Sequence, residues 1–185
     1  MVVEEPILPD APPPRGKPVD LRLHVDGDDA VERRTRRTRI GFFVYLNSAP
    51  IVWCSNRQST IESSVFGAEF VAVKHGIETV RGVRYKLRMM GVPLSGATCV
   101  YGDNMSVIHN TKRPESVLKK KSNSICYHTI RESCAAGESI TGHIRSKDNP
   151  SDLASKILPS GQLREHLVRD TPLLYDIYDD HSEKE

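Results

Sequence analysis

Three short segments near the start of the chain carry the pattern of a sheet. Residues 21–26 alternate apolar and polar side chains, and residues 40–46 and 49–54 are rich in β-branched and aromatic side chains. The last two segments are separated only by a turn at Asn47 and Ser48. The pattern predicts three strands in an antiparallel meander, with the second and third strands forming a hairpin.

A long amphipathic helix follows the three strands. Apolar side chains recur at steps of three and four, which predicts a helix over residues 62–90. Its stripe is formed by Phe66, Phe70, Val73, Ile77, Val80 and Leu87. Ser63 and Ser64 are suited to cap its first turn, and Gly91 and Pro93 are expected to end it. Glu69 lies beside the stripe, near the start of the helix.

The rest of the chain alternates short strands and helices. The pattern predicts a strand at 97–102, a short helix at 104–110, a longer helix at 124–136 and a fifth strand at 139–144. Asn149 and Pro150 suit the N-cap and first position of a further helix. The order β-β-β-α-β-α-α-β-α predicts an α/β fold with one mixed sheet covered by helices.

Length and composition favour one domain with tails at both ends. Residues 1–18 are rich in proline and predict an extended linker, residues 19–160 the domain, and residues 161–185 a short helix and an acidic tail. No apolar run approaches a membrane-spanning length, and the N-terminus lacks the layout of a signal peptide. The four cysteines show no CxxC spacing, which disfavours a zinc site.

Four acidic residues are expected to meet where strands end and helices begin. Asp26 closes the first predicted strand, Asp103 the fourth, Glu69 lies in the first turns of the long helix, and Asp152 in the first turn of a late helix. In an open sheet, these positions converge on one crevice. Gathered carboxylates repel each other unless cations hold them, and oxygen ligands suit Mg²⁺ or Mn²⁺. Two such ions can promote phosphodiester hydrolysis.

Several ordered segments extend this interpretation into a family resemblance. The chain resembles the ribonuclease H domain of copia-type LTR retrotransposon Pol polyproteins, over roughly residues 20–160. The matching segments are His24-Val25-Asp26, residues 33–42, 49–58 and 63–72, Gly102-Asp103-Asn104, residues 127–132, and residues 149–152 with Ile157-Leu158-Pro159.

This resemblance implies a ribonuclease H-like fold with a five-stranded mixed sheet of three antiparallel and two parallel strands. It implies that Asp26, Glu69, Asp103 and Asp152 are the catalytic metal ligands. Two Mg²⁺ or Mn²⁺ ions would then support endonucleolytic hydrolysis of RNA in RNA–DNA hybrids during reverse transcription. The implied partners are the hybrid and an upstream reverse-transcriptase domain, without a membrane. An intracellular location follows, in a cytoplasmic virus-like particle, with nuclear entry as an option.

Further residues are candidates for contacting nucleic acid. The formal net charge is +2, but basic residues are concentrated in two places. The candidates are Arg33, Arg34, Arg36, Arg37, Lys119, Lys120 and Lys121, which could bind phosphates or be merely solvated, together with Asn104. His143, after the fifth strand, is a candidate auxiliary residue for proton transfer or product release, or a structural histidine.

Some positions depart from the family pattern or compete for its roles. Ser122 stands where many members have histidine, Asp28 and Asp29 compete with Asp26, and Asp148 competes with Asp152. No polymerase portion precedes the domain, so a fragment, a processed product or a decayed gene copy is expected. The alternatives to an active enzyme are an inactive hybrid-binding or connection module, another nuclease or integrase on this fold, and a transposon relic.

Overall fold

A single five-stranded sheet forms the centre of the computed structural model, which describes residues 9–28, 37–59, 64–112 and 123–169. The strand order is β3-β2-β1-β4-β5. The strands are β1 (Leu21–Asp28), β2 (Arg39–Leu46), β3 (Ala49–Arg57), β4 (Thr98–Gly102) and β5 (Ser139–His143). β1, β2 and β3 pair antiparallel, whereas β4 pairs parallel with both β1 and β5. The predicted mixed sheet of three antiparallel and two parallel strands is confirmed.

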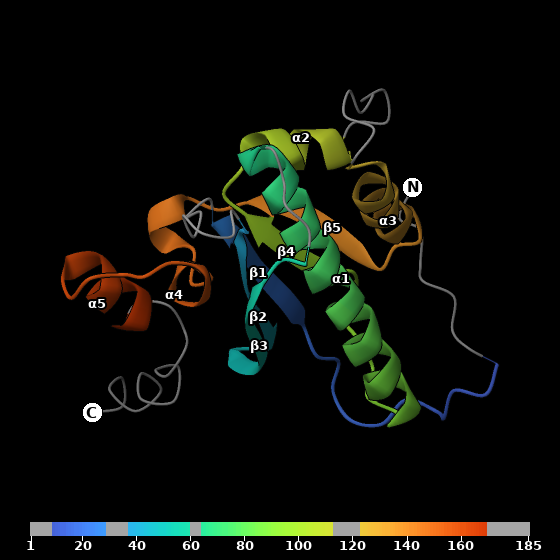
Figure 1. The fold of residues 1–185 in the computed structure, drawn as a ribbon. Helices are drawn as coiled ribbons and strands as arrows, with labels where there is room; N and C mark the ends of the chain where they lie inside the picture. Colours follow the sequence, from blue (N-terminus) through green and yellow to red (C-terminus); the bar gives the residue numbers. More distant parts are fainter. Residues whose placement is uncertain (1–8, 29–36, 60–63, 113–122, 170–185) are drawn as a thin grey trace, which may run out of the picture.

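Helices cover both faces of this sheet (Figure 1). They are α1 (Val65–Met89), α2 (Met105–Lys112), α3 (Ser124–Ala135), the 3-10 turn η2 (Ser146–Asp148), α4 (Asp152–Ser155) and α5 (Gln162–Arg169). α1 begins at Val65, later than the predicted start at residue 62, and it ends at Met89, within one residue of the prediction. Ser64 is its N-cap, and Gly91 adopts a φ of +75° just after its C-cap at Met90. None of the described helices is long and apolar enough to cross a membrane.

The main core lies between the sheet and α1. Leu23, Val25 and Val44 of the sheet are fully buried, as are Phe70 and Ile77 of α1. These residues follow the period of two along the strands and the predicted stripe along the helix. α3 packs beside α1, where Ile130 is fully buried and the Tyr127 ring lies 6.4 Å from that of Phe70. The hydrophobic pattern therefore fixes which side of α1 faces the sheet.

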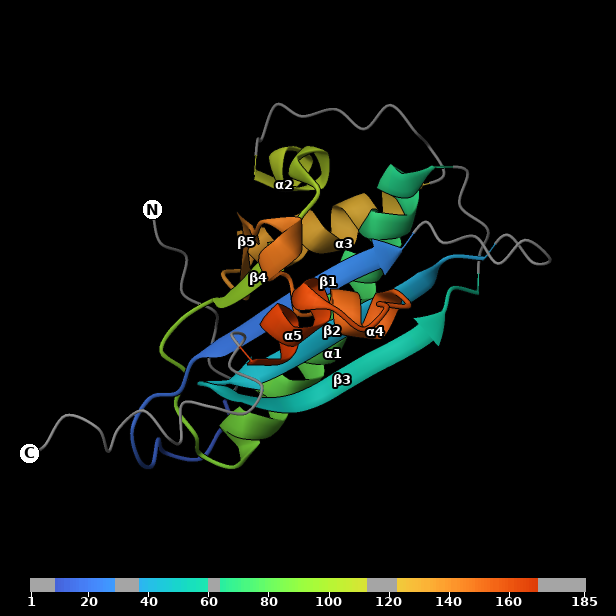
Figure 2. The same cartoon turned by 90° about the vertical axis from the view of Figure 1, so that its left-hand side faces the viewer.

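An aromatic cluster occupies the opposite face of the sheet. The His24 ring stacks on Tyr101 with centroids 5.1 Å apart and meets Tyr45 edge-on at 5.4 Å. Burial lowers the pKa of His24 to about 4, with a smaller contribution from Arg22, so the imidazole is neutral near pH 7. α4 and α5 lie over this face (Figure 2). The late part of the chain thus covers the side of the sheet that α1 leaves open.

β1 extends two residues beyond its predicted end. Gly27 and Asp28 continue the antiparallel ladder opposite Ile40 and Arg39 of β2. A Cβ at Gly27 would lie 2.9 Å from the carbonyl oxygen of Ala68, so glycine allows the first turn of α1 to approach β1 closely. The sequence pattern placed the end of this strand at Asp26, but pairing with β2 continues it to Asp28.

The N-terminal segment is attached to the loop that follows α1. The Arg15 amide donates to the Gly91 carbonyl at 2.7 Å, and the Val19 amide donates to the Pro93 carbonyl at 3.0 Å. Val19 also forms an isolated parallel bridge with Leu94. Residues 15–19, which overlap the end of the predicted linker, therefore lie against the loop at the C-terminal end of α1.

Candidate active site

Asp26 and Asp103 lie just beyond the point where β1 and β4 cease to pair. The parallel register ends with His24 opposite Tyr101. Asp26 follows His24 by two residues along β1, and Asp103 follows Tyr101 by two residues, just after the end of β4. Asp26 is 1% exposed, whereas Asp103 is half-buried. The shared register places the two carboxylates at the same end of the sheet, as the sequence predicted.

Glu69 approaches the same place from the first turns of α1. The Ser64 hydroxyl accepts a hydrogen bond from the Gly67 amide at 3.2 Å and fixes the helix start. The buried Gln58 side chain donates to the Ala68 carbonyl at 2.8 Å and ties this turn to the end of β3. The Gly27 amide donates to the Glu69 carboxylate, which connects the helix directly to β1.

The three carboxylates form one compact cluster. One oxygen each from Asp26, Glu69 and Asp103 lies within 4.8 Å of the other two. Burial raises the pKa of Glu69 to about 9, and the charges of Asp26 and Asp103 raise it further against the smaller opposing effects of Lys156 and the Gly27 amide. A carboxyl buried beside two others is costly to ionise, and the nearby Lys156 offsets only part of this cost.

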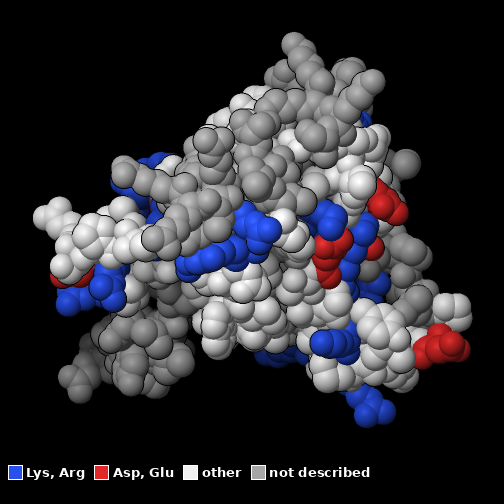
Figure 3. Space-filling view, in the orientation of Figure 1, with Lys and Arg blue, Asp and Glu red and all other residues white. Residues whose placement is uncertain are grey.

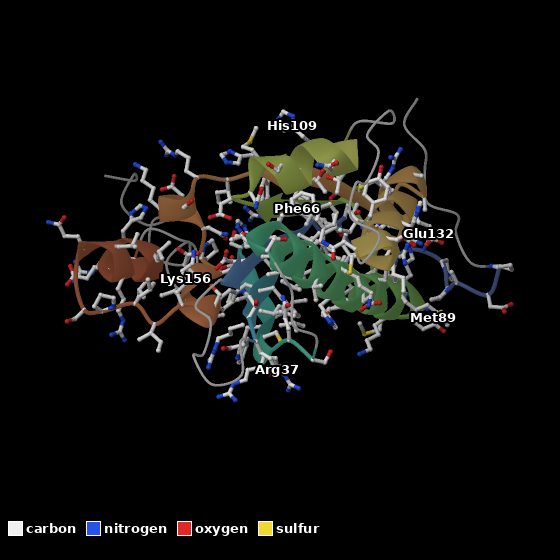
Figure 4. All side chains as sticks on the ribbon, turned by 45° about the horizontal axis from the view of Figure 1, so that its top comes forward. Arg37, Phe66, Met89, His109, Glu132 and Lys156 are labelled. Atoms are coloured by element: carbon white, nitrogen blue, oxygen red, sulfur yellow. The ribbon has the colours of Figure 1, made fainter. Side chains whose placement is uncertain are left out.

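Asp152 reaches the cluster through a lysine that the sequence analysis did not single out. The Lys156 ammonium lies 2.8 Å from Asp152 Oδ1 and 3.3 Å from Asp26 Oδ2. The Ser155 hydroxyl also donates to Asp26 Oδ2. Burial raises the pKa of Asp152 to about 6, with Asp26 and Asp103 adding to the rise while the Lys156 hydrogen bond opposes it. Figure 4 shows Lys156 between α4 and the sheet.

The pKa of Lys156 reflects the same acidic surroundings. Burial alone would lower the pKa of its ammonium, but the charges of Asp26, Asp152 and Asp103 outweigh burial and raise it. Lys156 is therefore charged throughout the ordinary pH range. Its spacing of four residues from Asp152 is a helical pair and was visible in the sequence. Its contact with Asp26 was not visible there.

The position of α4 depends on a glycine and a buried asparagine. Gly41 lies opposite Asp26 in the β1–β2 register, and a Cβ there would fall 2.5 Å from the Ser155 nitrogen. Asn149 is fully buried and donates through Nδ2 to the Val25 carbonyl at 3.2 Å. Close contact on β2 and a side-chain bond to β1 together hold Asp152 beside Asp26.

The predicted start of this last helix is wrong. Asn149 was expected to be its N-cap and Pro150 its first residue, but α4 begins at Asp152. The Asp152 amide donates to the Asn149 carbonyl at 3.2 Å in a preceding turn. The Asn149 side chain is shared among three partners: its Nδ2 donates to the Val25 carbonyl, and its Oδ1 accepts from the Ser151 hydroxyl at 2.6 Å and from the Ser151 amide at 3.3 Å.

Asp148, the alternative to Asp152 as a metal ligand, is bound by other residues. Asp148 lies in η2, where Arg145 Nε contacts its Oδ2 at 2.6 Å and His166 Nε2 lies 3.0 Å from its Oδ1. These contacts connect η2 to α5. The hydrogen bond to His166 and the neighbouring Arg145 lower the pKa of Asp148. Asp148 thus belongs to the packing of α5. Of the rivals of Asp26, Asp29 lies outside the described residues, and only the backbone of Asp28 is described.

The other predicted site residues have different outcomes. Asn104 caps α2, accepting from the Ser106 amide at 2.9 Å. Arg37 and His143 are exposed. Arg33, Arg34, Arg36 and Lys119, Lys120 and Lys121 lie outside the described residues. Figure 3 shows more basic than acidic side chains among the described residues of the face it presents. A role for any of these residues in binding nucleic acid remains a prediction.

The donor set fits a hard divalent cation. Asp26, Glu69 and Asp103 offer only carboxylate oxygens, which Mg²⁺ and Mn²⁺ prefer, and Lys156 offsets only part of the cost of ionising the buried Glu69. Asp26 and Asp152 could hold a second ion, since both contact the same ammonium in this structure. The four predicted ligands therefore lie together, three in direct proximity and Asp152 through Lys156.

Comparisons of sequence find relatives among plant transposons. The chain is 26% identical over 144 residues to the retrovirus-related Pol polyproteins from transposons RE1 and RE2 of Arabidopsis thaliana. It is 24% identical over 139 residues to that of transposon TNT 1-94 from Nicotiana tabacum. The matches cover 75–78% of this chain but only 10% of each relative. No family model matches the chain.

Comparisons of structure find ribonuclease H domains. The N-terminal ribonuclease H domain of a Mycobacterium tuberculosis protein aligns with a TM-score of 0.57 at 12% identity, covering 74% of this chain and 91% of that one. LC11-RNase H1, solved in complex with an RNA/DNA hybrid, aligns with a TM-score of 0.56 at 15% identity, covering 73% and 93%. The chain therefore has the ribonuclease H fold and is homologous to a segment of the Pol polyproteins of plant retrotransposons.

Proposed function

We propose that this chain is a ribonuclease H that hydrolyses the RNA strand of RNA–DNA hybrids with the help of two divalent ions. The convergence of Asp26, Glu69 and Asp103 within 4.8 Å, at the end of a ribonuclease H-like sheet, carries the proposal. The homology to retrotransposon Pol polyproteins and the hybrid-bound LC11-RNase H1 support it. In this proposal, a reverse-transcriptase domain of the parent polyprotein is the partner that delivers the hybrid.

The residues of the site divide into two sets. Asp26, Glu69 and Asp103 would hold one ion, and Asp26 with Asp152 the other. When bound, the two ions supply an activated water and stabilisation of the leaving oxygen. The Gly27 amide orients the Glu69 carboxylate, and the Ser155 hydroxyl orients Asp26. Glu69 must release its proton before it can act as a ligand, so binding of the ion is coupled to proton release.

The test is cleavage of a hybrid labelled on its RNA strand, in Mg²⁺ or Mn²⁺ and in excess EDTA. Asp103→Asn removes a ligand charge at nearly constant volume, and we expect it to abolish cleavage without unfolding the protein. Asp148→Asn is the matched control, because Asp148 pairs with Arg145 and His166 outside the cluster. We expect this control to cut at the wild-type rate.

The pattern of results separates the readings of the site. Metal-dependent cutting that is lost in Asp103→Asn and kept in Asp148→Asn supports the assignment. Cutting by Asp103→Asn would refute it. Tight hybrid binding without cutting, by folded protein with or without an added polymerase domain, would indicate a hybrid-binding module instead.

A further inference from the structure

Lys156 lies between two of the carboxylates that the proposed function assigns to metal ions. Its ammonium contacts Asp152 Oδ1 at 2.8 Å and Asp26 Oδ2 at 3.3 Å, so one cation bridges two elements, α4 and β1. Asp26 and Asp152 are 2% and 6% exposed in their side chains. A positive charge at this place compensates two buried carboxylates that repel each other.

The acids of the site therefore differ in the groups that offset their negative charge. Asp26 and Asp152 share the Lys156 ammonium, whereas Glu69 is contacted by a neutral amide, that of Gly27. Asp26 belongs to both sets, because it also lies within 4.8 Å of Glu69 and Asp103. The pair of Asp26 and Asp152 already holds a cation, and the cluster of three acids shares only Asp26 with this pair.

We propose that Lys156 acts as a built-in competitor for the second divalent ion, holding Asp26 and Asp152 together until that ion displaces its ammonium. This inference rests on the proposed two-ion site. The first ion binds to Asp26, Glu69 and Asp103 while Lys156 stays in place. The second ion binds only when the ammonium leaves Asp26, so Lys156 sets its affinity.

The geometry allows the ammonium to leave without unfolding α4. Lys156 follows the last residue of α4, and its side chain is 31% exposed, so a path to solvent exists. The contact with Asp26 is the longer of its two, and Asp152 lies only four residues away along the same segment. The flexible stem of lysine can therefore swing from Asp26 while the backbone of α4 stays docked.

The test measures the binding of Mn²⁺ to the metal-free full chain by calorimetry and by electron paramagnetic resonance. Lys156→Met removes the charged terminal nitrogen and keeps an unbranched, flexible side chain that is one atom shorter. We expect the second dissociation constant to fall on the order of tenfold or more, because a unit charge close to the ion is removed. The first constant should change less. The metal-free variant should also unfold at a lower temperature, a loss that saturating Mn²⁺ removes.

Two variants control for the charge and for the type of contact. Lys156→Arg keeps a cation and should bind the second ion about as weakly as the wild type. Lys74→Met removes a helical ion pair of the same 2.8 Å length and four-residue spacing, Lys74 with Glu78, on α1. It should leave both dissociation constants unchanged.

A second measurement applies even where Lys156→Met fails to fold. In the wild type, the nuclear magnetic resonance signal of the Lys156 ε-methylene should shift in the second step of a Mg²⁺ titration and not in the first. Equal second constants in wild type and Lys156→Met, or a Lys156 signal that never moves at saturation, would overturn the proposal. Failure of the proposed function would look different, because neither the wild type nor any variant would then cut the hybrid, whatever their affinities for the ions.

Discussion

Gly41 is the position where a single added methyl group should disturb the site most selectively. It lies in β2 opposite Asp26, and α4 packs directly over it. The Cβ of an alanine there would fall 2.5 Å from the Ser155 nitrogen and 2.7 Å from the Ser151 carbonyl oxygen. Both are backbone atoms, so no side chain can rotate away from the clash.

The size of the effect follows from these distances. To restore ordinary contacts of 3.4 Å or more, α4 must move by about 1 Å relative to β2. We expect Gly41→Ala to destabilise the fold by about 1–3 kcal/mol, the usual cost of overpacking. The same shift would lengthen the bonds of Ser155 and Lys156 to Asp26. A displacement of this size in an active site costs on the order of 100-fold in rate.

The assay is urea unfolding in EDTA, followed by hybrid cleavage at saturating Mg²⁺. Gly82→Ala is the matched control, because Gly82 lies in the middle of α1 and a Cβ there would meet nothing within 4 Å. We expect this control to gain about 0.5–1 kcal/mol of stability, since alanine favours the helix, and to cut normally. Wild-type stability and cleavage in Gly41→Ala would refute the close docking of α4 on β2.

The remaining predictions concern hydrogen bonds and protonation around the same site. Asn149→Ala should cost about 1–3 kcal/mol in urea unfolding because it leaves the buried Val25 carbonyl without its partner, and an unchanged midpoint would contradict this. Ser64→Ala should lose about 1 kcal/mol through the missing cap of α1, whereas Ser64→Asp should retain the cap and the stability. Burial raises the pKa of Glu69 in the folded protein to about 9 from its ordinary value of 4.5, so unfolding releases its proton at neutral pH. The free energy of unfolding of the metal-free protein should therefore fall between pH 7 and 9, by up to about 1.4 kcal/mol per pH unit. Glu69→Gln should abolish this slope, and an equal slope in the variant would exclude Glu69 as its source.

Local patterns predicted the sheet and α1 well because their signals are contained in the elements themselves. The alternation along β1 and the stripe along α1 identify their buried sides without knowledge of any neighbour. Ser64 and Gly91 mark the ends of α1 by backbone chemistry that acts within a single turn. Three carboxylates could be located for the same reason, since each lies at the end of a strand or the start of a helix.

The environment of the fourth carboxylate could not be predicted, because it depends on packing between distant segments. The Ser155 hydroxyl reaches Asp26 across 129 residues of sequence. Gly41 looks like an ordinary strand residue until α4 is placed over it. Judged by its side chain alone, Asn149 suits a helix cap. Its hydrogen bond to the Val25 carbonyl depends on packing between distant segments. Lys156 had a local signal, its spacing from Asp152, but not its second contact.

The carboxylates that local patterns could locate and the one whose surroundings they could not predict belong to two different parts of the site. Asp26, Asp103 and Glu69 are placed by the register of β1 with β4 and by the first turns of α1, which belong to the main core. Asp152 depends on a four-residue helix held by the contact at Gly41 and the side chain of Asn149. Changes at α4 should therefore weaken the second ion site while the first persists. Gly41→Ala and Lys156→Met both act on α4 and should have opposite effects on the second ion, because one displaces the ligand and the other removes its competitor.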